Sequence, residues 1–316
     1  MNIILFGYNG LIGSYILKEL AQQLKKFKYI KIICVGRNIE NKPFKSKKII
    51  YIKWDFLNFV NPNLSFFVKK NIIINCIGKN NGNLKNLSKI NFKFIKKLIN
   101  YIGENKIEAH FIHLGSVSVY STENKDLGKN KNIKENSITK PIDLYSKSKL
   151  EADDFIQKSL KKKGNKLSYT ILRIANVFSY SKNSNAFNLI RFLLNKGIWL
   201  KCSNSTRYHF IHAKDVAQAV LLCVLKPKNS KNKIYIVSDD ENQFELHKIY
   251  AKIKNINLLK LPISSKLLKF FFKYFFLPKK LINFLFTISS EINYDNSKLK
   301  KELNFKTKYS LRDKIF

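Results

Sequence analysis

The chain has 316 residues, of which 45% are hydrophobic and 13% aromatic, so it is long enough and apolar enough to bury a full core. These proportions exclude a disordered or collagen-like chain. The 59 lysine and arginine residues outnumber the 21 acidic residues and give a net charge of +38, which would suit a nucleic acid or an anionic membrane as a partner.

The kind of basic residue argues against a dedicated nucleic-acid-binding protein. The arginines are Arg37, Arg173, Arg191, Arg207 and Arg312, and every other basic residue is a lysine. Arginine is the preferred side chain for bidentate recognition of phosphates and bases. The lysines are spread along the whole chain and form no single basic arm. We therefore interpret the charge mainly as a feature of composition and predict no specific nucleic-acid partner.

The cysteines and the apolar segments indicate the compartment. Cys34, Cys76, Cys202 and Cys223 have no CxxC spacing and predict reduced thiols, with no metal site. The apolar residues 1–6 are too short for a signal-peptide core, and no stretch reaches about 18 uncharged apolar residues. We expect a cytoplasmic protein without a transmembrane segment.

Short apolar runs alternate with segments of helical periodicity through the first two thirds of the chain. The runs at 3–6, 30–35, 49–52, 72–77, 109–114, 169–174 and 234–237 predict strands, and 11–27 and 87–102 predict helices. Nearly all-apolar strands indicate burial on both faces of a sheet. The alternation predicts an α/β fold with a doubly wound parallel sheet of the Rossmann type.

The alternation fades after residue 176, which predicts two parts. We expect a sheet domain formed by 1–176 and by 210–240, and a smaller C-terminal lobe formed by 177–209 and 241–316. The Lys/Asn-rich stretch 124–134 predicts a solvated loop. The aromatic stretch 270–276 predicts part of the lobe core or a homodimer face, with contact to a membrane surface as the alternative.

A glycine-rich turn follows the first predicted strand, in the order Gly7-Tyr8-Asn9-Gly10-Leu11-Ile12-Gly13. Gly7 permits a tight turn, Gly10 lets the backbone approach a pyrophosphate, and Gly13 lets helix and strand pack closely. The N-terminus of the helix then faces the anion. We predict that residues 7–13 hold a dinucleotide.

The GxxGxxG spacing resembles the extended branch of the short-chain dehydrogenase/reductase superfamily, whose members modify nucleotide sugars. By this resemblance, Asp55 and Phe56 contact the adenine, and Cys76, Ile77 and Gly78 line the nicotinamide ribose. NAD enzymes usually carry an acid at the end of the second strand, whereas this chain has glycine followed by Arg37. Because a cation there can pair with a 2′-phosphate, we predict NAD(P) as the cofactor and favour NADP(H).

The same family uses a Tyr-x-x-x-Lys pair with a serine or threonine. Tyr and Lys four residues apart share a helix face, so the ammonium can lower the pKa of the phenol. The bare pattern is expected about 2.6 times by chance in a chain this rich in lysine, and it occurs at Tyr145/Lys149, Tyr250/Lys254 and Tyr294/Lys298. Only the first lies in a family-like context, Tyr145-Ser-Lys-Ser-Lys149 with a trailing acid, downstream of a Ser116-Val-Ser-Val-Tyr segment. The resemblance therefore assigns catalysis to Ser116, Tyr145 and Lys149.

Three further residues are predicted to contact the substrate. Asn176 lies in Leu-Arg-Ile-Ala-Asn-Val-Phe, which resembles the family segment whose asparagine binds substrate. Arg207 lies about one residue from the place where the family often carries a diphosphate-binding arginine. Ser118 lies close behind Ser116.

Three functions remain possible for the protein, two of them enzymatic and one a binding function. The family's 4,6-dehydratases carry acids directly after the catalytic hydroxyl residue, whereas this chain has Val117 and Ser118. This disfavours dehydration and leaves 4-epimerisation or 4-keto reduction. Because the C-terminal lobe resembles that of epimerases in bacterial polysaccharide pathways, we predict a nucleotide-sugar 4-epimerase of polysaccharide biosynthesis. The alternatives are an NADPH-dependent reductase of a 4-keto sugar, favoured by Arg37, and a non-catalytic family member that keeps its nucleotide.

Overall fold

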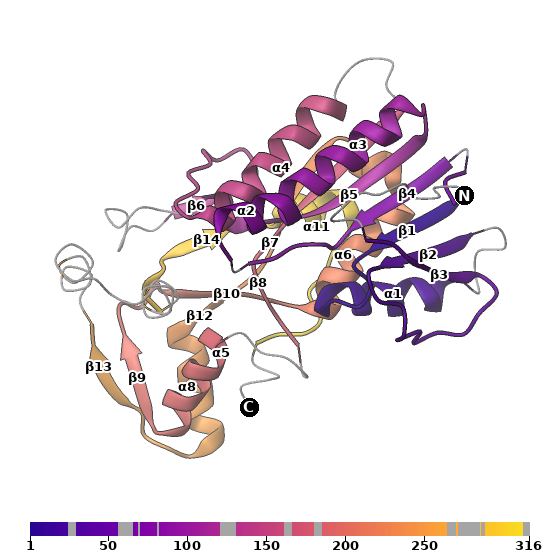
Figure 1. Ribbon diagram of the computed structural model, residues 1–316. Helices are drawn as coiled ribbons and strands as arrows, with labels where there is room; N and C mark the ends of the chain where they lie inside the picture. Colours follow the sequence, from indigo (N-terminus) through magenta and orange to yellow (C-terminus); the bar gives the residue numbers. More distant parts are fainter. Residues whose placement is uncertain are drawn as a thin grey trace.

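Seven parallel strands form the central sheet of the protein (Figure 1). The computed structural model describes residues 1–24, 30–55, 66–68, 70–80, 82–120, 131–160, 166–179, 185–263, 270, 285 and 288–311. The strands of the sheet are β1 (Asn2–Phe6), β2 (Lys31–Gly36), β3 (Ile49–Lys53), β4 (Lys70–Asn75), β5 (Glu108–Ser116), β7 (Leu167–Ile174) and β11 (Lys233–Val237). Their order is β11-β7-β5-β4-β1-β2-β3, with each neighbouring pair parallel. The predicted doubly wound α/β fold is confirmed, and its topological switch point lies between β1 and β4.

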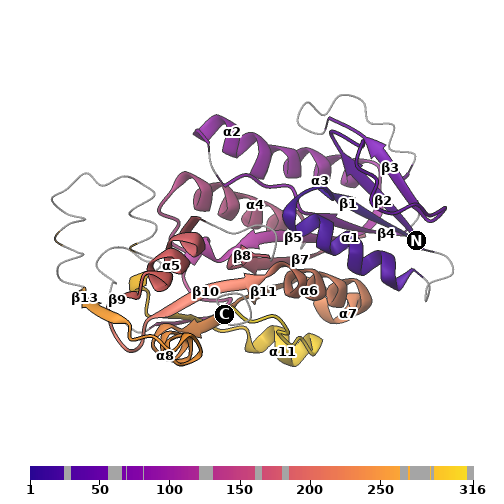
Figure 2. The same ribbon diagram turned by 90° about the horizontal axis from the view of Figure 1, so that it is seen from below.

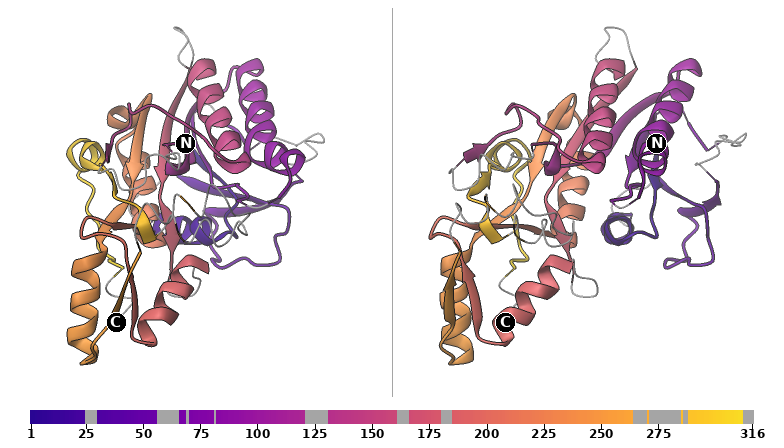
Figure 3. Two further views of the ribbon diagram at one scale, coloured as in Figure 1. Left: turned by 90° about the vertical axis from the view of Figure 1, so that its left-hand side faces the viewer. Right: turned by 60° about the vertical axis from the view of Figure 1, so that its left-hand side comes forward.

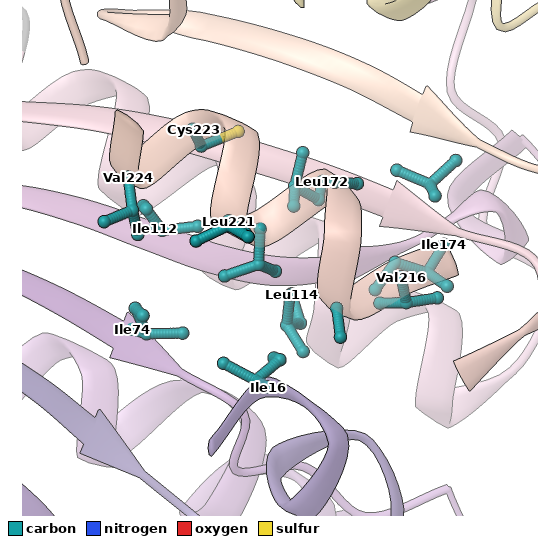
Figure 4. Close-up of a cluster of buried hydrophobic side chains, with 14 of the residues drawn as sticks. Ile16, Ile74, Ile112, Leu114, Leu172, Ile174, Val216, Leu221, Cys223 and Val224 are labelled. Atoms are coloured by element: carbon teal, nitrogen blue, oxygen red, sulfur yellow. The ribbon is translucent and has the colours of Figure 1, made fainter. Parts of the chain in front are cut away.

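Helices cover both faces of this sheet. Helices α1 (Leu11–Gln23) and α6 (Ala213–Leu225) pack on one face, and α3 (Phe94–Glu104) and α4 (Leu144–Leu160) pack on the other (Figures 1 and 2). Along β4, Ile72 and Ile74 belong to the first core and Ile73 to the second. Figure 4 shows the first core, where Ile16 of α1 and Val216 of α6 lie over the strands. This burial on both faces explains why the strands are almost entirely apolar.

The seven strands agree with the predicted runs within a few residues, whereas the helices differ more. The predicted helix 87–102 is instead α2 (Leu84–Ser88), a π-helical turn η1 (Lys89–Lys93) and α3. Helix α1 ends at Gln23, and the end of the predicted helix 11–27 lies outside the described residues. Strand β4 ends at Asn75, two residues early, because the Asn75 Oδ1 accepts a hydrogen bond from the Ile77 amide at 3.1 Å and turns the chain.

Part of the predicted loop 124–134 is a strand. Residues Lys131–Ile133 form β6, which pairs in parallel with β14 (Ile292–Tyr294), and residues 124–130 lie outside the described residues. The pairing joins segments about half the chain apart, so local composition carried no sign of it. Composition alone therefore gave the wrong prediction for residues 131–133.

Most of the remaining elements lie away from the central sheet. Strands β8 (Asn176–Phe178), β10 (Arg207–His212) and β12 (Asp239–Asn242) form one small sheet, and β9 (Ile198–Lys201) pairs with β13 (Leu259–Pro262). Helices α5 (Asn185–Asn195) and α8 (Gln243–Lys254) gather beside β9 and β13 (Figures 1 and 3). Helix α7 (Pro227–Ser230) follows α6, and α11 (Ser297–Leu303) packs on β11.

Three further sequence predictions concern membrane spans, the cysteines and the aromatic stretch. Within the described ranges, no helix combines the length and the apolar character needed to cross a bilayer. All four cysteines are free, with Cys34 and Cys223 buried. The aromatic stretch 270–276 lies outside the described residues, apart from an exposed Phe270.

Candidate active site

The glycine-rich turn lies where β1 ends and α1 begins, at the carboxyl edge of the sheet. Gly7 adopts a left-handed φ of 81°, and the Gly10 amide donates to the Gly7 carbonyl oxygen at 3.0 Å. A Cβ on Gly13 would lie only 2.2 Å from that oxygen, so only glycine permits this approach of helix to turn. The turn fits a pyrophosphate, because it brings backbone close to the ligand at an N-terminus of α1 that carries no acidic residue.

The side chains within this turn divide into two groups. Tyr8 was predicted to contact cofactor, but its ring is buried and its hydroxyl donates to the Asn41 carbonyl oxygen at 3.1 Å. A Cβ on Gly36 would lie 3.0 Å from the Tyr8 ring, which therefore packs beneath the end of β2. Asn9 is exposed and donates to the Asn38 carbonyl oxygen at 2.9 Å, and Leu11 and Ile12 are half-buried. The Tyr8 ring thus supports the turn from the side of β2.

The other predicted cofactor residues follow strands that neighbour β1. Arg37 directly follows β2 and is exposed, and Asp55 is exposed two residues after β3. Cys76, Ile77 and Gly78 follow β4. Phe56 lies outside the described residues. Because these strand ends share one edge of the sheet, the segments flank the glycine turn as a dinucleotide site requires.

Helix α4 presents Tyr145 to the end of β5. The helix starts at Leu144, and the Asp143 carboxylate caps it by accepting the Ser146 amide at 2.7 Å. The Tyr145 side chain lies beside Ser116, the last residue of β5. Burial raises the pKa of Tyr145, the neighbouring Ser116 lowers it, and nearby carboxylates at Asp143 and Asp153 raise it. A tyrosine hydroxyl placed beside a serine hydroxyl can act as a general acid or base.

Lys149 lies one helical turn after Tyr145 and is 5% exposed. Its Nζ donates to the Leu114 carbonyl oxygen at 2.9 Å, and a Cβ on Gly78 would lie 3.2 Å from the same Nζ. Burial lowers the pKa of Lys149 to about 8, while Asp153 and Cys76 raise it. The structure therefore brings Ser116, Tyr145 and Lys149 together with the loop predicted to line the nicotinamide ribose.

The predicted substrate residues are more dispersed. The Ser118 amide and hydroxyl donate to the Ser116 Oγ at 3.2 and 2.9 Å, so Ser118 belongs to the same cluster. Asn176 is exposed at the start of β8, and Arg207 is half-buried at the start of β10. Their roles stay predictions.

Two buried polar residues beside the site were missed by sequence reasoning. Asn91, in the π-helical turn, exchanges hydrogen bonds with the Lys79 backbone at 2.8 and 2.9 Å and donates to the Ser148 Oγ at 2.9 Å. Asp153 lies one turn beyond Lys149 and is fully buried. The trailing acid noted in the sequence, Glu151, is exposed instead. The spacing of four from Tyr145 to Lys149 to Asp153 was the available signal.

These features define a class of enzyme. A parallel sheet with a glycine turn after its first strand, and a serine, tyrosine and lysine at the neighbouring strand ends, is the arrangement of short-chain dehydrogenases and reductases. The model of the NAD dependent epimerase/dehydratase family matches residues 3–238. The chain belongs to this family.

Solved structures show the same fold over the whole chain. A UDP-glucuronic acid 4-epimerase from Bacillus cereus in complex with NAD is 16% identical, with a TM-score of 0.69 over 100% of this chain and 96% of that chain. A UDP-glucose 4-epimerase from Thermotoga maritima is 16% identical, with a TM-score of 0.66 over 100% and 96%. A dTDP-glucose 4,6-dehydratase from Bacillus anthracis is 14% identical, with a TM-score of 0.63 over 100% and 94%. No curated protein sequence matches the chain.

Proposed function

We propose that the protein is an NAD(P)-dependent nucleotide-sugar 4-epimerase. The observation that carries the proposal is the cluster of Ser116, Tyr145 and Lys149 at the carboxyl edge of the sheet, beside a glycine turn that fits a pyrophosphate. Similar structures include 4-epimerases for UDP-glucuronic acid and for UDP-glucose, which supports the same substrate class here. Val117 and Ser118 stand where the dehydratases of this family carry acids, which argues against dehydration.

The chain's own residues perform the proton chemistry. Bound NAD(P) supplies a reversible acceptor for the hydride of the sugar C4. Tyr145 takes the proton of the 4-hydroxyl, and the Ser116 hydroxyl holds the same sugar oxygen. We assign the buried Lys149 ammonium, one helical turn from Tyr145, to the ribose side of the site. Rotation of the 4-keto sugar exposes its other face, and Tyr145 then returns the proton to give the C4 epimer.

Substrate contacts follow from the remaining predicted residues. Ser118 adjoins Ser116 at the reacting end, and Asn176 and Arg207 lie on the neighbouring strands β8 and β10. We assign Asn176 to a sugar hydroxyl and Arg207 to the diphosphate. We assign the sugar to the side of the lobe formed by 177–209 and 241–316. We also propose that the enzyme is cytoplasmic, forms a homodimer and acts in polysaccharide synthesis.

A 4-keto sugar reductase is the second candidate. The exposed Arg37 after β2 favours it, because a preference for NADP(H) suits an enzyme that consumes NADPH. The two reactions differ in stoichiometry, since an epimerase leaves its cofactor unchanged.

The test incubates the purified protein with NAD or NADPH and a panel of nucleotide sugars that includes UDP-glucose, UDP-glucuronic acid and a 4-keto sugar. Cofactor absorbance and sugar identity are followed together. Interconversion of C4 epimers without net oxidation supports the epimerase. Consumption of one NADPH per sugar identifies the reductase, and no turnover with any sugar supports the non-catalytic alternative.

A further inference from the structure

A carboxylate lies buried beneath the catalytic cluster. Asp153 is fully buried on α4, four residues after Lys149 and eight after Tyr145, so the three side chains share one face of the helix. Its Oδ2 accepts a hydrogen bond from the Arg173 Nε at 2.9 Å. Buried carboxylates are rare unless they are paired, and Arg173 supplies one partner.

The second oxygen of this carboxylate faces the active site side of β5. A Cβ on Gly115 would lie 3.1 Å from Asp153 Oδ1, so the glycine before Ser116 makes room for it. The His113 Nε2 lies 3.8 Å from the same oxygen. Among the described residues, neither atom has a hydrogen-bond partner. Asp153 Oδ1 thus makes no hydrogen bond within the described residues, and it affects nearby groups through its negative charge.

Asn75, at the end of β4, fixes the orientation of the His113 ring. Asn75 Oδ1 accepts the Ile77 amide at 3.1 Å, so its Nδ2 is the atom that donates to His113 Nδ1 at 3.3 Å. The proton of the neutral imidazole then lies on Nε2 and faces Asp153. Burial lowers the pKa of His113 well below its usual value, and Lys149 lowers it further, so the ring stays neutral. A polar chain therefore runs from the loop at Ile77 to Asp153.

We infer that Asp153 is a positioning residue that keeps the Lys149 ammonium charged and in place beside the cofactor. The inference deepens the proposed function, because it rests on the role given to Lys149 there. Arg173 pairs with this carboxylate, and Lys149, a second buried cation, lies one helical turn away on α4. A purely structural ion pair would need only Arg173 as the partner of Asp153. Because Asp153 also lies one helical turn from Lys149, its negative charge acts on Lys149 as well.

The balance of charges around Lys149 supports this. Burial lowers the pKa of Lys149 to about 8, and Asp153 and Cys76 oppose that fall. Burial raises the pKa of Asp153, while Arg173 and then Lys149 lower it, and the exposed Asp154 raises it. Loss of the Asp153 charge would therefore lower the pKa of Lys149 further.

The test measures the dissociation constant of NAD between about pH 6 and pH 9, where Lys149 titrates. Asp153→Asn alone leaves Arg173 buried without its counter-ion and is expected to fold poorly. The decisive variant is therefore Asp153→Asn with Arg173→Met, which removes both charges. Asp154→Asn is the matched control, because it removes the same charge from the next, exposed residue of α4. Asp153→Glu tests rescue by a conservative change.

In the wild type, NAD binding should weaken as pH rises through about 8. The double variant should fold and show this midpoint at least about one pH unit lower, that is, roughly fivefold weaker binding at the wild-type midpoint. Asp154→Asn should keep the wild-type midpoint, and Asp153→Glu should restore it in part. An unchanged midpoint in a folded double variant would overturn the inference. If the midpoint moves but no sugar is epimerised, the proposed function fails while the role of Asp153 toward Lys149 stands.

Discussion

The Nζ of Lys149 donates a hydrogen bond across 2.9 Å to the carbonyl oxygen of Leu114, two residues before Ser116 on β5. The backbone of one strand therefore sets the positions of both the lysine ammonium and the serine hydroxyl. Tyr145, one turn earlier on α4, lies at the same strand end beside Ser116. The geometry of the cluster thus depends on how α4 packs against β5.

Removal of the Tyr145 hydroxyl should abolish most turnover. Tyr145→Phe removes the group that exchanges a proton with the sugar, and the loss of kcat should be roughly 10²- to 10⁴-fold. Stability, measured by thermal unfolding, should change little, because the ring keeps its packing. Intact turnover in this variant would show that another residue carries the proton.

Tyr250→Phe is the matched control for that experiment. Tyr250 and Lys254 repeat the Tyr-x-x-x-Lys spacing on α8, but the Tyr250 hydroxyl donates to Asn195 Oδ1 at 2.7 Å. This variant should lose about 1 kcal/mol of stability with its hydrogen bond and keep full turnover.

A methyl group at Gly13 should damage the dinucleotide site. Gly13→Ala places a Cβ 2.2 Å from the Gly7 carbonyl oxygen, so the turn or the helix must move. We expect a loss of about 1–3 kcal/mol in unfolding free energy and a clear rise in the NAD dissociation constant. Gly103→Ala is the control, because no atom lies within 4 Å of a Cβ there. On α3 this change should stabilise the protein by up to about 1 kcal/mol, and equal losses in the two variants would contradict the account.

Arg37 should set the choice between the two cofactors. Arg37→Ala removes the exposed cation after β2 and should weaken NADP binding about tenfold relative to NAD. Isothermal titration with both cofactors measures the ratio. Arg191→Ala, an exposed arginine on α5, controls for the general loss of positive charge. An unchanged ratio would remove the basis for favouring NADP(H).

His110 should make the fold sensitive to acid. Its Nδ1 and Nε2 contact the hydroxyl oxygens of Ser168 and Thr170 at 2.8 and 2.9 Å, and burial, then Lys231, lowers its pKa to about 4. Between pH 6.5 and 4 the unfolded chain binds this proton while the native protein does not, so stability falls as the pH drops through that window.

The size of this effect follows from the shift. A fall of about 2.5 pKa units corresponds to roughly 3 kcal/mol. Urea unfolding at about pH 7 and pH 4.5 measures it. In His110→Gln the loss should shrink, with the remainder due to His113 and His247, whose pKa values burial also lowers. The same pH dependence in both proteins would contradict the role of His110.

Sequence alone predicted the elements that rest on local pattern. Most of the seven strands were recognisable because both of their faces are buried, whereas the edge strand β3 is partly exposed. Gly13 was recognisable because no other residue fits against Gly7. The pairing of β6 with β14 was beyond reach, since its residues lie far apart in the chain. The π-helical turn at Asn91 was also missed, because its cause is a set of hydrogen bonds to Lys79 and Ser148.

In the proposed catalytic cluster, too, some features could be predicted from the sequence and others could not. Context separated Tyr145 from Tyr250 and Tyr294, whereas the charge environment of Lys149 depends on burial that no spacing reveals. Glu151 and Asp153 both trail Lys149 in sequence, and only the packing of α4 decides that Asp153 turns inward. Tyr8 is the converse case, since its place in a turn predicted to bind cofactor gave no sign that its ring packs beneath β2.

The fate of the hydrogen on C4 tests the central claim most directly. The purified protein is incubated with NAD and a UDP-sugar carrying deuterium at C4, in ordinary water, and the product is analysed by NMR and mass spectrometry. The epimerase account predicts both C4 epimers, each with the deuterium still at C4, and no lasting change in cofactor absorbance. Loss of the deuterium from the sugar, or stoichiometric conversion of the cofactor, would contradict it.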